Sequence, residues 1–84
     1  MPYIKQEQRH FLDKHLDIPR PKDVGELNYI ITQLCRDFLA SGRAGYAEHN
    51  AVVGVLECAK LEFYRRAVSV YEDQKRDLNG EVYT

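Results

Sequence analysis

The segment from about residue 46 to residue 78 most constrains the fold of this 84-residue chain. It contains no proline and has Gly54 as its one weak point, so it predicts a helix of about 30 residues, roughly 45 Å long. On a wheel of about 100° per residue, its apolar arc is about 200° wide, whereas a helix packed on one neighbour needs roughly 100–140°. We therefore expect the preceding helix to cover one side of this arc, and either the N-terminal helix or a symmetry-related copy of the chain to cover the other. The arc contains Val52, Val53, Leu56, Ala59, Leu61, Phe63, Tyr64, Ala67, Val68, Val70 and Tyr71.

Two shorter helices are expected before the long one. Apolar residues at helical spacing predict a narrow helix over about 5–17, which Pro19 and Pro21 end. A second helix is expected over about 24–41, where Asp23 is a good N-cap and Glu26 follows three residues later as in a capping box. Its apolar residues fill about half of the cylinder, which is typical of a helix buried on one side.

Glycine-containing stretches separate the predicted elements. Ser41-Gly42-Arg43-Ala44-Gly45 ends the second helix, with Gly42 as a left-handed cap, and Asn79-Gly80 ends the third before a short tail over 79–84. The sequence thus predicts one all-α domain over 1–84, in which a short N-terminal helix precedes an antiparallel helical hairpin with a long C-terminal helix. A chain of this length has a thin core, which favours support from a partner chain.

Charge and composition exclude several classes of function. The chain has 12 Lys and Arg against 13 Asp and Glu, so we expect neither a general nucleic-acid binder nor a membrane-surface module. No apolar run reaches the length of a membrane span, and the charged N-terminus lacks a signal core. We therefore expect a cytoplasmic protein, in which Cys35 and Cys58 are free thiols.

Three polar side chains fall inside the apolar arc of the long helix. Glu57 and Lys60 are three residues apart and can pair along the helix, and Tyr64 follows one turn later. Because a buried charge needs a partner, three interpretations are open. Lys60 extends to water with Glu57 at the edge of the arc, the two join an ion-pair network between subunits, or they contact a ligand.

The facing helix adds further candidates for partner or ligand binding. Asn28 lies within the apolar face of the second helix, where Glu57 or Lys60 would serve as its hydrogen-bond partner; the alternative is a boundary Asn bonded to a loop carbonyl. Tyr29 and Arg65 point away from the apolar faces and are expected on the surface. Tyrosine is enriched at interfaces, and this chain has six.

No residue pattern predicts an enzyme, a metal site or a cofactor. His10, His15 and His49 do not share a helical face, and the one Glu-x-x-His spacing, Glu7 to His10, lacks the second copy that a di-iron site needs. A hydrolase or transferase that uses Glu57 as its base ranks last among our hypotheses, because no nucleophile or metal set accompanies it.

Several motifs together carry a family resemblance over nearly the whole chain. The sequence resembles a family of short, uncharacterised proteins of bacteria and their phages with no assigned function. That resemblance implies a stand-alone protein in a phage or prophage setting. The motifs are Met1-Pro2-Tyr3-Ile4-Lys5, Gly25-Glu26-Leu27-Asn28-Tyr29, Gly54-Val55-Leu56-Glu57-Cys58, Lys60-Leu61-Glu62-Phe63-Tyr64-Arg65-Arg66, Tyr71-Glu72-Asp73 and Asn79-Gly80-Glu81-Val82-Tyr83.

Two functional hypotheses follow. The first is a non-enzymatic, homo-oligomeric interaction module that binds a host or phage protein. The alternative is a binder of a small anionic, nucleotide-like ligand at a patch between the second and third helices. There Tyr29 or Tyr64 would stack on the ligand, and Lys60 with Arg65 would hold its charge.

Overall fold

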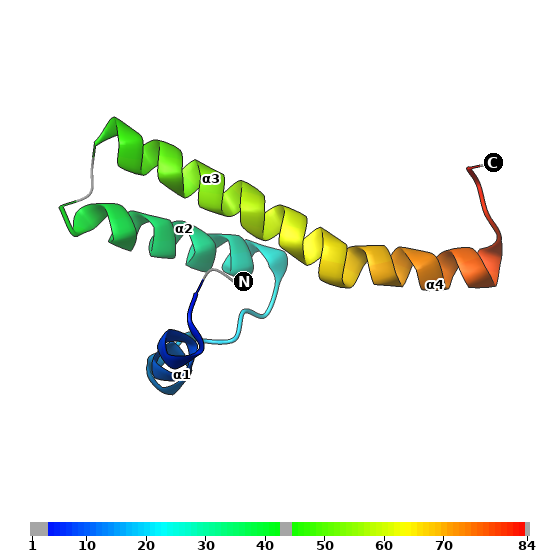
Figure 1. Ribbon diagram of the computed structural model, residues 1–84, viewed down its shortest axis with the longest axis horizontal. Coiled ribbons are helices and arrows are strands. Elements are labelled where there is room, and N and C mark those ends of the chain that lie inside the picture. Colours follow the sequence, from blue (N-terminus) through cyan, green and yellow to red (C-terminus); the bar gives the residue numbers. More distant parts are fainter. Residues whose placement is uncertain (1–3, 43–44, 84) are drawn as a thin grey trace. The chain divides into compact units, whose positions relative to one another are not determined.

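The computed structural model describes residues 4–42 and 45–83, and within these ranges all regular structure is helical, with no strand (Figure 1). The all-α prediction, with three helices of which the C-terminal one is long, is confirmed. Arg43 and Ala44 of the predicted connection and Thr84 of the predicted tail lie outside the described residues.

The first helix, α1 (Gln6–His15), is shorter than the predicted 5–17. Its N-terminus is closed by a hydrogen bond from the backbone N–H of Lys5 to Gln8 Oε1, 3.1 Å long. Leu16 leaves the helical conformation, and the N–H of Asp17 turns back to the carbonyl of His15. The helix therefore ends at His15, before it reaches Pro19 and Pro21.

The second helix, α2 (Val24–Ala40), begins and ends almost as predicted. The Asp23 carboxylate accepts a 2.8 Å hydrogen bond from the N–H of Glu26, which confirms the N-cap. The Glu26 carboxylate accepts from the N–H of Lys22 rather than that of Asp23, so the capping box is closed one residue earlier than usual. Gly42 has a φ of +81°, which confirms the left-handed position after the helix.

The long C-terminal helix has three parts: α3 (Tyr46–Phe63), a π-helical turn η1 (Tyr64–Val68) and α4 (Ser69–Asn79). The N–H of Ser69 donates to the carbonyl of Tyr64, five residues back, which is the π-helical hydrogen bond. Figure 1 shows the ribbon continuing from α3 into α4 and changing direction where η1 lies. The predicted extent of the long helix is thus confirmed to within a residue. The prediction of one α-helical period along its whole length is wrong.

A glycine and a set of ion pairs fix the end of α4. Gly80 has a φ of +94°, and its N–H donates to the carbonyl of Arg76 over 2.8 Å, so the predicted stop is confirmed. The Arg76 guanidinium lies within 4.0 Å of carboxylates of Asp73, Asp77 and Glu81. Because Glu81 is beyond the helix, this arginine holds the start of the tail against α4.

The chain divides into two units, residues 1–43 and residues 44–84. Taken by itself, neither unit has a single buried residue among those the structure describes. The predicted hairpin and single domain concern how the two units associate, and they stay predictions.

Candidate functional site

The six predicted site residues are divided between the two units. Asn28 and Tyr29 belong to α2, in the first unit. In the second, Glu57 and Lys60 belong to α3, while η1 contains Tyr64 and Arg65. A patch shared by the second and third helices stays a prediction.

In the first unit, Asn28 and Tyr29 are both exposed. The carbonyl of Asn28 accepts a 2.9 Å hydrogen bond from the Thr32 hydroxyl. The Tyr29 side chain is 64% exposed, which confirms its surface position, and it lines a shallow groove with Pro19 and Ile30. This groove is mostly apolar and is also lined by Glu26, so it offers apolar contact area beside one carboxylate.

In the second unit, Glu57 and Lys60 form the predicted ion pair. The Lys60 Nζ lies 3.3 Å from Glu57 Oε1, and the two side chains are 69% and 56% exposed respectively. Water screens a pair this exposed, and such pairs on a helix stabilise it by about 0.3–0.5 kcal/mol. The predicted pairing is confirmed, and it leaves neither charge buried.

Tyr64 has a partner that the sequence reasoning missed. Its hydroxyl donates a 2.8 Å hydrogen bond to Glu72 Oε1, from η1 to α4. This hydrogen bond and the negative charge of Glu72 raise the pKa of Tyr64 above 10.0, with smaller contributions from desolvation and Tyr83. Tyr64 is therefore a neutral hydrogen-bond donor at physiological pH.

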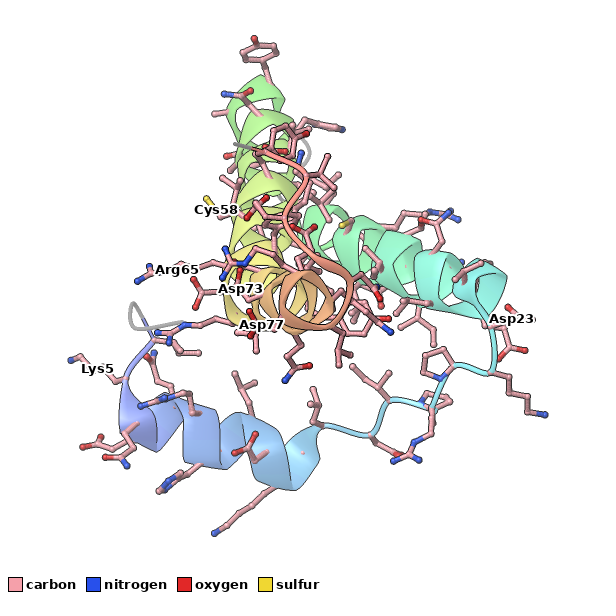
Figure 2. All side chains as sticks on the ribbon, turned by 90° about the vertical axis from the view of Figure 1, so that its right-hand side faces the viewer. Lys5, Asp23, Cys58, Arg65, Asp73 and Asp77 are labelled. Atoms are coloured by element: carbon pink, nitrogen blue, oxygen red, sulfur yellow. The ribbon has the colours of Figure 1, made fainter. Side chains whose placement is uncertain are left out.

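The π-turn explains how Tyr64 reaches a residue eight positions away. Two turns of an α-helix contain about 7.2 residues, so residues eight apart differ by about 80° around the axis. A π-turn contains about one residue more than an α-helical turn. Residues eight apart across it therefore lie within about 20° of each other around the helix axis. Arg65 and Asp73 are also eight apart, and they project on the same side of the helix in Figure 2.

The same step corrects the helical wheel. Residues after Val68 are turned back by about 100° relative to the uniform wheel, so Val70 leaves the stripe in which that wheel placed it. Tyr71 instead comes into line with Phe63, eight residues earlier. The single arc of about 200° is therefore wrong beyond η1. The eight-residue interval between apolar positions was the signal in the sequence that could have revealed it.

The charges around η1 limit what it can bind. Lys60 and Tyr64 each have an acidic neighbour, Glu57 and Glu72, which an incoming anion would have to displace. Arg65 has no ion-pair partner among the described residues. An anionic ligand at this position stays a prediction.

Across residues 4–42 and 45–83, no group of three or more His, Cys, Asp and Glu side chains is placed to hold a metal ion. No helix described there has the length and apolar character needed to cross a membrane. Cys35 and Cys58 are free cysteines, and the predicted reducing compartment stays a prediction.

Comparison with known proteins identifies a family and no function. No curated protein and no solved structure matches this chain. The model of one family, described as a domain of unknown function, matches residues 1–82. The predicted occurrence in bacteria and phages stays a prediction, but the resemblance to an uncharacterised family is confirmed: the chain belongs to the family "Domain of unknown function (DUF6899)".

Proposed function

We propose that this protein is a small, non-enzymatic accessory protein of the cytoplasm that acts as a homo-oligomeric interaction module for a host or phage protein. The observation that carries the proposal is the absence of a buried residue from the described part of either unit, while large apolar side chains are exposed throughout. A stable fold requires these side chains to be covered by protein.

The apolar face of α2 illustrates how much surface needs cover. Leu27, Ile31, Leu34 and Phe38 recur at intervals of four, three and four residues, and each is between 39% and 50% exposed. Full burial of one such side chain is favourable by about 1.5–3 kcal/mol. A chain of this length has a thin core, and association with another chain supplies further burial.

The tyrosines support a binding surface rather than a purely structural one. Tyr29, Tyr46 and Tyr71 are 64%, 87% and 58% exposed. A tyrosine ring offers a large apolar contact area with a polar tip, and such residues are enriched at protein interfaces.

Sedimentation velocity on the intact chain tests the proposal. We expect a species of at least twice the 9.8 kDa chain mass at tens of micromolar, with dissociation on dilution. A single folded monomer throughout that concentration range would overturn the homo-oligomer and with it the proposed function.

A further inference from the structure

The second unit carries an apolar stripe along most of the long helix, which we call the long-helix seam. Its members are exposed except for Val52, which is half-buried. Phe63 is 66% exposed and Leu78 76%. The seam consists of Val52, Leu56, Ala59, Phe63, Tyr71 and Leu78.

The spacing of the seam is that of a coiled coil with one extra residue. Its members follow at intervals of four, three and four residues as far as Phe63, then eight to Tyr71, then seven to Leu78. The eight-residue interval spans η1, the turn that absorbs one additional residue. The hydrogen bond from Tyr64 to Glu72 shows that an eight-residue step across η1 returns to the same side. The two halves of the seam are therefore in phase.

The length of the seam suits a pairing of helices. It runs from residue 52 to residue 78, nearly four heptads, which is the length over which coiled-coil patterns are recognised, and Gln74 is the polar inner position of its last heptad. Ala59 of the seam and Ala67 beside the seam are both small, so a second helix can approach closely near the middle of the seam.

Charges on the two edges of the seam indicate which helix would pair with it. Lys60 and Lys75 lie on one edge, and Glu62 and Asp77 lie on the other. The Lys75 ammonium lies 5.6 Å from the centre of the Tyr71 ring, which keeps it beside the seam. In a parallel pair of identical helices, the basic edge of one faces the acidic edge of the other. In an antiparallel pair, each edge faces its own copy and like charges meet.

We infer that two copies of this chain pair in parallel along the long-helix seam, with the π-turn keeping the two halves of each seam in phase. This inference rests on the proposed function and names the surface and direction of the homo-oligomer. The seam is self-complementary about a two-fold axis that runs along it, as an isologous dimer requires.

Disulfide trapping in the full chain tests both the surface and the direction. Val52 and Gln74 lie equally far from Phe63: Val52 is a member of the seam, and Gln74 occupies the inner position between Tyr71 and Leu78. Val52→Cys and Gln74→Cys are made separately in a background with Cys35→Ser and Cys58→Ser. In a parallel pair, each variant alone forms a cross-linked dimer under mild oxidation, because identical inner positions face each other. Wild-type Cys58 in a Cys35→Ser chain is the control: it is exposed, lies about 100° or more around α3 from every seam residue of that helix, and should not cross-link.

Every other outcome of the trapping overturns the inference. Cross-links that form only when the two variants are mixed show an antiparallel pair. An oligomer in sedimentation without cross-links from either variant shows that another surface holds the copies together, and the proposed function survives. A monomeric wild-type chain overturns both the inference and the proposed function.

Discussion

At the scale of the residue, the hydrogen bond between Tyr64 and Glu72 acts by constraining the geometry of the helix. Both side chains are exposed, so water competes for the bond. What the bond provides is a link between η1 and α4 that fits only when the two residues share a side of the helix. It therefore favours the π-helical phase over a uniform α-helical one, in which the same residues would lie about 80° apart.

We predict that one tyrosine titrates at higher pH than an ordinary phenol and that Glu72 is the cause. The pKa of Tyr64 is raised above 10.0 in the folded state, because the neutral phenol donates to Glu72. The stabilisation that the neutral phenol gives to the folded state is therefore complete at pH values below 10. It is lost as the pH rises through the raised pKa. Tyrosinate absorbance should show a late phase that Tyr64→Phe removes and Glu72→Gln moves toward pH 10.

The neighbouring carboxylate provides the control for this titration. Asp73→Asn removes the same charge one residue later, from a side chain that pairs with Arg76 rather than Tyr64. It should leave the late phase in place. Equal effects of Glu72→Gln and Asp73→Asn would show that general charge, and not the hydrogen bond, sets the pKa of Tyr64.

At the scale of the element, the helices were predictable because their ends are local. Asp23, Gly42 and Gly80 act through contacts within a few residues, which a sequence displays directly. The π-turn was not predicted, because a wheel with one fixed period cannot represent a change of period. The same wheel hid Glu72 by placing it about 80° from Tyr64. The pairing of Glu57 with Lys60 was predictable, since three residues of one helix separate them.

Deletion of a single residue tests the role of η1. Deleting Ala67 removes the additional residue, so the turn can become α-helical while Phe63 and Tyr71 keep their common side, now seven residues apart. We expect circular dichroism to show a thermal midpoint within a few degrees of wild type, roughly the effect of less than 1 kcal/mol.

Deletion of Ala59 provides the comparison: it removes the same residue type from within α3, at a position that belongs to the seam. It turns Val52 and Leu56 by about 100° relative to Phe63, with no irregular turn there to absorb the change. We expect a midpoint lower by at least about 5 °C, or loss of the cooperative transition. Equal destabilisation by the two deletions would contradict the role given to η1.

At the scale of the whole molecule, sequence patterning shows which faces are apolar but not what covers them. Helical spacing identifies the stripe on α2 and the long-helix seam, and the structure leaves both exposed within their own units. Covering is a property of contacts between distant segments or between chains, and no local interaction of a helix fixes it. For that reason the helices could be predicted from the sequence while the partner of Tyr29 or of the seam could not.

The leucines of α3 separate the seam from the rest of the helix surface. Leu56 belongs to the seam, whereas Leu61 lies close to the opposite side, and they are 41% and 57% exposed. We expect Leu56→Glu to weaken self-association by at least about tenfold in sedimentation equilibrium, because it places an unpaired charge where two copies meet. Leu61→Glu adds the same charge to the same helix and should change the dissociation constant by less than about threefold. If Leu61→Glu were the more disruptive of the two, the copies would meet on the side of the helix opposite the seam.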